Sequence, residues 1–274
     1  MSFINNLRAR WSSAGMVCVG LDPDPAKLPD CLKASNDAIF EFNKAIIDAT
    51  HDIVCCYKPQ AAYYAAADAD DALRRTIAYI HDNYPGIPVI LDVKRGDIGA
   101  TARMYAVEAF DRYGADAVTV NPYMGTDALD PFIDRNDRGV VILCRTSNPG
   151  GSDLQNLVAD GKTIYEHVAV LAATRWNRNG NVLLVAGATY PEELGKIRKL
   201  IGDMPLLVPG VGAQGGSVEA VIANGLDSSG YGLVINSSRG IIYASKGDDF
   251  AEKAREATLE LNRTIEAARK VAER

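Results

Sequence analysis

Three charged residues follow an apolar run at residues 87–91, and their types and spacing suit acid–base chemistry. The run Ile-Pro-Val-Ile-Leu is typical of a strand covered on both faces, and Asp92, Lys94 and Asp97 come directly after it. Side chains two apart on a strand point the same way, so we expect Asp92 and Lys94 to share a face. Gly96 permits a sharp turn that would return the Asp97 carboxylate towards the Lys94 ammonium. Because buried charges are costly unless paired, the group is either an ion pair closing a strand end or a functional site.

The composition argues against two classes of binding partner. The 274 residues are 47% hydrophobic and carry a formal net charge of −6, which argues against binding to nucleic acid or to an anionic membrane. Any anionic substrate must therefore be held by a local positive site. No apolar stretch is long enough to cross a bilayer, and the first residues lack the apolar core of a signal peptide, so we expect a cytoplasmic protein.

Cysteine and histidine usage gives no sign of a metal site. The three histidines are scattered on predicted helices, without a ligand pair at i and i+4. Five cysteines occur without CxxC spacing and are predicted to be reduced core residues: Cys18, Cys31, Cys55, Cys56 and Cys144.

Short apolar runs alternate with helical-period segments along the whole chain. Eight strands are predicted, at 16–21, 53–58, 87–93, 116–121, 139–145, 181–186, 205–209 and 231–236. Helices are predicted between them, at 36–50, 67–84, 101–113, 162–179, 190–201 and 217–225, with a long one at 249–272 closing the chain. No linker divides the sequence. This order predicts a single (β/α)8 TIM barrel domain over residues 1–274, with an N-terminal and a C-terminal helix.

Polar residues follow most of the predicted strands. Barrel active sites lie at the carboxyl ends of the strands, so these residues are expected to gather at one rim. In chain order they are Asp22, Lys58, the Asp92/Lys94/Asp97 group, Asn121, Arg145 to Asn148, Gly210 to Gly216, and Ser237 to Gly240.

A glycine-rich loop and an arginine follow the last two strands. Pro209-Gly-Val-Gly-Ala-Gln214-Gly-Gly leads into a helix near Ser217, and small residues let backbone N–H groups approach an anion. Tight turns also need glycine, so the loop alone is weak evidence. Arg239, at the next strand end, supplies a planar fork that suits a phosphate dianion, and together they predict a phosphate site.

Lys58 ends another apolar run. It is either a lysine extending out of the barrel end or a member of an alternating Lys58-Asp92-Lys94-Asp97 array. Carboxylates on both sides of Lys94 would keep it protonated, which suits a proton donor rather than a Schiff-base nucleophile.

Together these motifs resemble the orotidine 5'-phosphate decarboxylase family, in its longer bacterial type. The resemblance rests on Lys58, Pro209 to Gln214 and Arg239, and on the stretches DVKRGDIGAT, NPYMG, RTSNPG and INSSRGI. It runs in order from Asp22 to Arg239. It implies decarboxylation of orotidine 5'-monophosphate to uridine 5'-monophosphate, the last step of de novo pyrimidine nucleotide synthesis, without metal or organic cofactor.

The resemblance also implies a role for each site residue. Lys94 would protonate C6 after carbon dioxide leaves, Asp92 and Asp97 would flank the substrate carboxylate, and Lys58 would complete the array and touch the ribose. The other implied contacts are ribose hydroxyls for Asp22 and Thr101, the pyrimidine edge for Ser147, the base pocket for Pro209, and phosphate for Gln214 and Arg239. Asn121 either contacts substrate or only orders its loop.

A homodimer with shared active sites is implied as well. In the family the second aspartate and the following Ile and Thr come from the neighbouring subunit, here Asp97, Ile98 and Thr101. Residues 146–161 are expected to form a lid over base and phosphate.

Two other functions fit parts of the pattern. Related barrel enzymes acting on sugar phosphates share Asp-x-Lys-x-x-Asp but use magnesium, and Lys58 with RTSNPG favours the nucleotide enzyme over them. A non-catalytic sensor of a phosphate ligand would need only the glycine-rich loop and Arg239. Four alternating charges argue against it.

Overall fold

Eight parallel strands form the central sheet of the computed structural model, which describes residues 2–211 and 216–272. Their spatial order is β2-β1-β10-β9-β8-β5-β4-β3. Bridges from Tyr57 to Val89 and from Gln60 to Asp92 join the two ends of this order, so the sheet closes into a barrel. The strands are β1 (Val17–Leu21), β2 (Cys56–Pro59), β3 (Ile90–Arg95), β4 (Ala117–Val120), β5 (Gly139–Arg145), β8 (Val182–Ala186), β9 (Leu206–Pro209) and β10 (Leu233–Ser237). The predicted barrel and its strands are confirmed.

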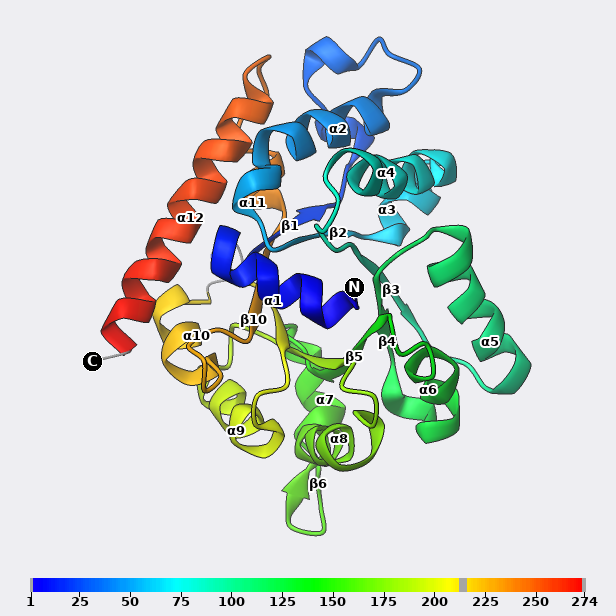
Figure 1. Ribbon diagram of the computed structural model, residues 1–274, viewed down its shortest axis with the longest axis vertical. Helices are drawn as coiled ribbons and strands as arrows, with labels where there is room; N and C mark the ends of the chain where they lie inside the picture. Colours follow the sequence, from blue (N-terminus) through cyan, green and yellow to red (C-terminus); the bar gives the residue numbers. More distant parts are fainter. Residues whose placement is uncertain (1, 212–215, 273–274) are drawn as a thin grey trace.

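Helices surround the barrel (Figure 1). The α-helices are α1 (Phe3–Ala14), α2 (Ala38–Thr50), α3 (Ala61–Ala66), α4 (Asp70–Asn83), α5 (Gly99–Val107), α6 (Thr126–Ile133), α7 (Ser152–Gln155), α8 (Ile164–Leu171), α9 (Pro191–Ile201), α10 (Val218–Gly225), α11 (Arg239–Ile242) and α12 (Phe250–Ala272). Short 3-10 turns are η1 (Pro25–Lys27), η2 (Asp30–Leu32), η3 (His51–Ile53), η5 (Pro122–Met124) and η6 (Pro149–Gly151). Two π-helical segments, η4 (Glu108–Arg112) and η7 (Ala172–Trp176), extend α5 and α8. The sequence prediction omitted α6, which contains Pro131.

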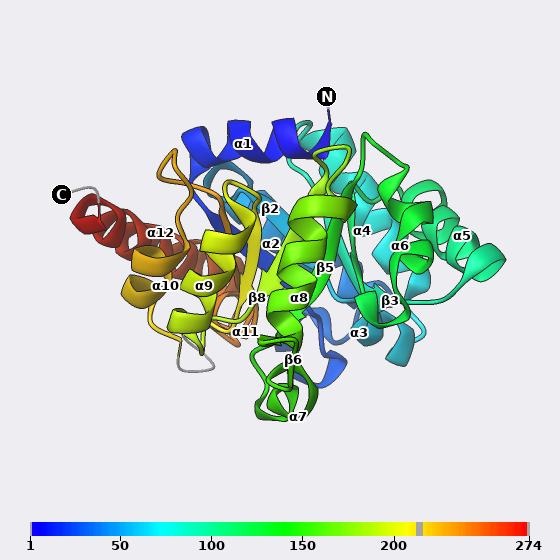
Figure 2. The ribbon, with the colours of Figure 1, turned by 90° about the horizontal axis from the view of Figure 1, so that it is seen from below.

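The segment predicted to be a lid has its own structure. It contains η6, α7 and an antiparallel hairpin of β6 (Val158–Ala159) and β7 (Lys162–Thr163). Figure 2 shows α7 and β6 projecting beyond the barrel on the side opposite α1. Thr163 then begins α8 with a capping box, because its hydroxyl and the Glu166 side chain satisfy each other's backbone N–H groups.

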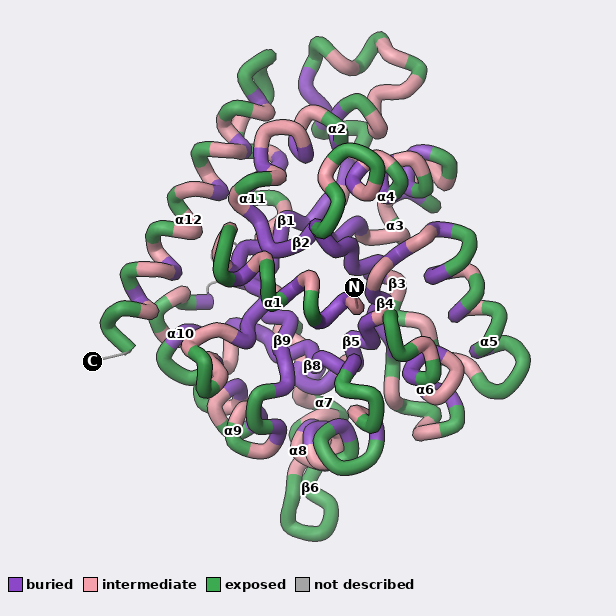
Figure 3. The backbone as a smooth tube through the Cα atoms, viewed as in Figure 1, coloured by how far each residue is buried: buried purple, intermediate pink, exposed green. Residues whose placement is uncertain are grey.

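Helix α1 covers one end of the barrel (Figures 1 and 2). Phe3, Leu7 and Trp11 point inwards and are buried. Phe3 packs so closely on Gly139, at the start of β5, that a Cβ there would lie 2.4 Å from its ring. The barrel strands are buried throughout most of their length (Figure 3). The amino-terminal end is therefore closed, and a site must use the carboxyl-terminal end.

All five cysteines are free thiols, as predicted. Four are buried, whereas Cys31 is exposed, so the prediction of a core position was wrong for Cys31. Cys31 lies in the short turn η2 of the β1–α2 connection rather than in an apolar strand.

Candidate active site

Asp92 binds two ammonium groups at the carboxyl end of the barrel. Its Oδ2 lies 3.1 Å from Lys58 Nζ and its Oδ1 lies 2.7 Å from Lys94 Nζ. The side chains of Lys58 and Asp92 are only 6% and 10% exposed, but that of Lys94 is 47% exposed. The structure thus brings together the first three members of the predicted array, and Lys94 is the one that a substrate can reach.

The charged groups of this cluster stabilise one another's ionised forms. Burial raises the pKa of the Asp92 carboxyl, but Lys58 and Lys94 lower it by more, to about 2. Burial alone would lower the pKa of Lys58, and the negative charges of Asp92 and Asp22 instead raise it well above its ordinary range. Asp92 is therefore ionised and Lys58 protonated at neutral pH.

Thr119, in β4, determines how the backbone presents Lys94. Its Oγ1 accepts the N–H groups of Val93 and Lys94 at 3.0 and 2.9 Å and donates to Asp92 Oδ1 at 2.9 Å. Lys94 has φ +50°, a left-handed conformation that costs a residue with a Cβ about 1–3 kcal/mol. Sequence reasoning missed Thr119. Its only signal was a hydroxyl in the apolar run Ala-Val-Thr-Val.

Asp97 does not return to the Lys94 of its own chain, so that expectation was wrong. Its Oδ1 accepts the N–H of Ile98 at 2.8 Å, and it forms no ion pair with any residue in the described ranges. The direction of the backbone after Lys94 follows from the contacts of Arg95. Its guanidinium donates to Glu108 at 3.0 and 2.9 Å and stacks on Tyr105. This anchor leads the chain outwards into α5.

Asp22 lies beside the cluster with one oxygen unsatisfied. Its Oδ2 accepts the Ser238 hydroxyl at 2.6 Å, whereas its buried Oδ1 has no hydrogen-bond partner among the described residues. A buried carboxylate oxygen normally has a donor, so Oδ1 is suited to a ligand hydroxyl. Ser238 was expected at the rim but was given no role; its hydroxyl also contacts the carbonyl of Gly20 at 3.1 Å.

The predicted phosphate residues follow β9 and β10. Arg239 begins α11 and is exposed, and its side chain forms no ion pair or hydrogen bond with the described part of the chain. Pro209 ends β9, and its carbonyl accepts the N–H of Ala188 at 3.0 Å. Gly210 has φ +94°, a conformation that favours glycine. Gln214 lies outside the described residues. The helix expected after this loop is α10, capped by the Ser217 hydroxyl.

Asn121 and Ser147 differ in what their side chains do. Asn121 Oδ1 accepts the N–H of Tyr123 at 3.0 Å and caps η5, which matches the loop-ordering alternative. Ser147 follows β5 and is half-buried, and its carbonyl accepts the Thr189 hydroxyl at 3.3 Å. The Ser147 hydroxyl has no hydrogen-bond partner among the described residues, so it is open to a ligand.

Ile98 and Thr101 lie with Asp97 outside the cluster. Both are exposed, Ile98 by 54%, at and within the first turn of α5. Within one chain, the structure therefore separates the predicted site residues into a cluster at the barrel mouth and a group on an outer face.

Comparison with known proteins identifies the family. The family model for "Orotidine 5'-phosphate decarboxylase / HUMPS family" matches residues 15–256. Proteins named orotidine 5'-phosphate decarboxylase from Dechloromonas aromatica and Cellvibrio japonicus are 58% and 57% identical. These matches cover 97% and 98% of this chain, and 98% and 100% of the relatives.

Solved structures agree with the sequence matches. Leishmania donovani OMP decarboxylase is 40% identical with a TM-score of 0.85, covering 98% of this chain and 99% of that chain. Leishmania donovani UMP synthase is 42% identical with a TM-score of 0.87, covering 98% of this chain and 56% of that longer chain. With the Lys58-Asp92-Lys94 cluster at the mouth of a (β/α)8 barrel, these matches show that the chain belongs to the orotidine 5'-phosphate decarboxylase family of carboxy-lyases.

Proposed function

We propose that this protein decarboxylates orotidine 5'-monophosphate to uridine 5'-monophosphate and carbon dioxide, the last step of de novo pyrimidine synthesis, with Lys94 as proton donor. The observation that carries the proposal is the ion-paired chain Lys58-Asp92-Lys94, in which only Lys94 is accessible. A substrate at the barrel mouth would meet an ammonium held in place by a buried carboxylate.

The proposed reaction uses charged side chains of the protein alone. When the C6–carboxylate bond breaks, carbon dioxide leaves and the electron pair stays on C6. The Lys94 ammonium stabilises the developing negative charge and then gives C6 a proton. Lys94 supplies both charge and proton, so the proposal includes no metal or organic cofactor.

Asp92 and Lys58 act through position and charge. Asp92, 2.7 Å from Lys94, orients the ammonium, and its retained negative charge faces the region where the substrate carboxylate would lie. Lys58 balances that charge from the buried side, 3.1 Å away, and would reach the ribose. Binding energy from remote groups can help to organise such an array.

The remaining site residues would hold the nucleotide. The unsatisfied Oδ1 of Asp22 supports binding of a ribose hydroxyl. The unpartnered hydroxyl of Ser147 would bind the pyrimidine edge, and Pro209 would line the base pocket. The exposed Arg239, with Gln214, would bind the phosphate.

A homodimer with shared sites would complete each array. Asp97, Ile98 and Thr101 would enter the partner's site, Thr101 binding ribose there. The surface around them supports burial by a second copy, because five large apolar residues of α5, η5 and the turn before α5 are exposed by 42–79%: Ile98, Met104, Val107, Tyr123 and Met124.

The proposed location is the cytoplasm. The five free thiols support a reducing compartment. Helices that could span a membrane are absent from the part of the chain that the structure describes.

Loss of orotate absorbance on incubation with orotidine 5'-monophosphate tests the function. Turnover should persist with chelator and should be abolished in Lys94→Ala, which should still fold and bind uridine monophosphate. Lys44→Ala, which removes a surface ion pair with Asp48 on α2, is the control and should be fully active. Near-normal turnover by folded Lys94→Ala would refute the mechanism, and loss of wild-type activity with chelator would favour a metal-dependent relative.

A further inference from the structure

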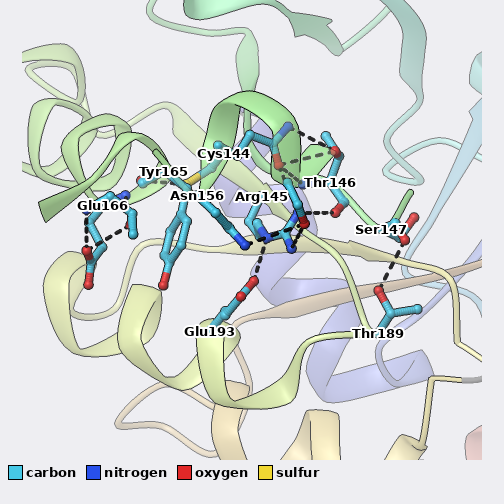
Figure 4. A network of polar contacts seen from close by, with 12 residues as sticks. Cys144, Arg145, Thr146, Ser147, Asn156, Tyr165, Glu166, Thr189 and Glu193 are labelled. Atoms are coloured by element: carbon cyan, nitrogen blue, oxygen red, sulfur yellow. Dashed lines mark hydrogen bonds and ion pairs between the residues drawn. The ribbon is translucent and has the colours of Figure 1, made fainter. Parts of the chain in front are cut away.

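Arg145 is a buried arginine next to the candidate active site. It has no role in the proposed reaction. It ends β5 and is 1% exposed, and its guanidinium stacks 3.9 Å above the ring of Tyr190. Its Nε donates to Glu193, which neutralises the buried charge (Figure 4). With so little surface, Arg145 cannot touch a substrate directly.

The other nitrogen atoms of Arg145 connect β5 to the segment that follows it. Nη1 donates to the Gln155 side-chain oxygen and to the Thr146 carbonyl, each at 3.2 Å. Nη2 donates to the Ser152 hydroxyl at 3.3 Å. One planar, fully charged group thus joins the strand end, α7 and α9.

Gln155, which Arg145 holds, in turn fixes Thr146, the residue before Ser147. Its Oε1 accepts the Thr146 N–H at 3.0 Å, and its Nε2 donates to the Thr146 hydroxyl at 2.9 Å. The chain folds tightly here: a Cβ on Gly151 would lie 2.7 Å from the Thr146 hydroxyl and 3.0 Å from Arg145 Nη1.

Ser147 is held from the opposite side as well. A Cβ on Gly187 would lie 2.8 Å from both the N and the Cα of Ser147, so the two backbones are in close contact. Thr189 also donates to the Ser147 carbonyl. The Ser147 backbone is therefore fixed on both sides, while its hydroxyl remains unpartnered among the described residues.

We propose that Arg145 is a positioning residue that, through Gln155 and Thr146, holds the Ser147 hydroxyl ready for the pyrimidine ring. This inference rests on the proposed role of Ser147 at the base edge. The network determines affinity for the base, whereas Asp22 and Arg239, proposed for ribose and phosphate, follow other strands and make no contact with it.

The test compares two ligands, uridine monophosphate and ribose 5-phosphate, which lacks the base. Gln155→Ala and Arg145→Lys should weaken binding of uridine monophosphate about tenfold and change binding of ribose 5-phosphate by less than about twofold. Arg145→Lys keeps the charge beside Glu193, and Gln155→Ala alters a partly exposed residue, so we expect both variants to fold.

Arg255→Lys is the control for the same substitution at another carboxylate-paired arginine. Arg255 is partly exposed and pairs with Asp52 through two nitrogen atoms, at 2.5 and 2.8 Å, near the start of β2. Both ligands should bind this variant as they bind the wild type. Equal weakening of both ligands by the Arg145 and Gln155 variants, or no weakening of either, would overturn the inference.

A coupling measurement separates this inference from the assignment on which it rests. Ser147→Ala should lose the same base-dependent affinity, and Gln155→Ala should add nothing in the Ser147→Ala background. If Ser147→Ala itself has no effect, both the Ser147 assignment and the inference fail. If Ser147→Ala loses affinity but Gln155→Ala and Arg145→Lys do not, or if the effects simply add, the inference alone fails.

Discussion

Asp92 is charged because two lysines surround it, and this charge links the site to the stability of the fold. Its pKa of about 2 lies below the ordinary carboxyl value, so its ionised form stabilises the folded state. That contribution is complete above about pH 4 and is lost as the pH falls through the folded-state pKa.

The lowered pKa of Asp92 makes the effect of Asp92→Asn on stability depend on pH. The difference in free energy of unfolding between wild type and Asp92→Asn should fall by roughly 2 kcal/mol between about pH 4 and pH 2, with wild type the more stable at neutral pH. Urea unfolding at a series of pH values measures it. Asp30→Asn, which breaks the exposed pair with Lys33, should show a much smaller change. A pH-independent difference for Asp92→Asn would contradict the assigned charge.

Thr119 is expected to be a positioning residue for Lys94. Thr119→Val removes the hydroxyl that accepts two backbone N–H groups and donates to Asp92. Lys94 should therefore lose its orientation. We expect kcat to fall about 100-fold, with uridine monophosphate binding largely retained. Steady-state kinetics and ligand titration check this result. Thr258→Val, which removes a buried hydroxyl in α12 that donates to Ala254, should leave kcat unchanged; if it lowers kcat equally, the Thr119 effect is not specific.

At the scale of elements, the strand ends and the short helices after them bring separate parts of the nucleotide site together. Helix α11 is only one turn long, and it starts with Arg239 directly after β10. Its neighbour β9 ends at Pro209, before the glycine-rich loop. Two adjacent strands therefore carry the residues proposed for phosphate.

Arg239→Ala should reduce transition-state stabilisation, calculated from kcat/KM for orotidine 5'-monophosphate, by about 2–3 kcal/mol. The reason is that a charged hydrogen-bonding partner of the phosphate is lost. The phosphate-free nucleoside should react equally poorly with variant and wild type. Arg263→Ala, on the exposed face of α12, is the control and should match wild type on both substrates. An equal loss on both substrates would show that Arg239 does not bind phosphate.

At the scale of the whole molecule, one chain does not complete the proposed array. Asp97 and Thr101 lie on an outer face, beside exposed apolar residues, whereas Lys94 lies at the barrel mouth. A C2 dimer would bring the outer group of each chain to the mouth of the other.

Mixed dimers test this arrangement. Lys94→Ala and Asp97→Ala homodimers should each be nearly inactive, but a mixed dimer places both lesions in one site and leaves the other intact. With random exchange, half of the dimers are mixed, so roughly a quarter of wild-type activity per chain should return. Refolding differently tagged chains together provides the heterodimers. Heterodimers without recovered activity would rule out shared sites.

The sequence by itself determined the barrel and the charged cluster. Eight apolar runs, most of them followed by polar residues, predict both the strands and the rim, because parallel strands present their carboxyl ends at one side. The spacing of Asp92 and Lys94 predicted that they lie together, although Lys94 departs from regular strand geometry with φ +50°, and Lys58 ended the neighbouring strand. These are local patterns, which a sequence carries directly.

Only the tertiary structure decided which groups meet across strands and where the chain leaves the rim. The Thr119 hydroxyl contacts Asp92 because β4 pairs with β3, and Ser238 contacts Asp22 because β10 pairs with β1. The Arg95–Glu108 pair carries Asp97 outwards, although the spacing alone allowed a return to Lys94. Such contacts join residues 13 to 216 positions apart, and they depend on barrel closure and packing, which no local pattern specifies.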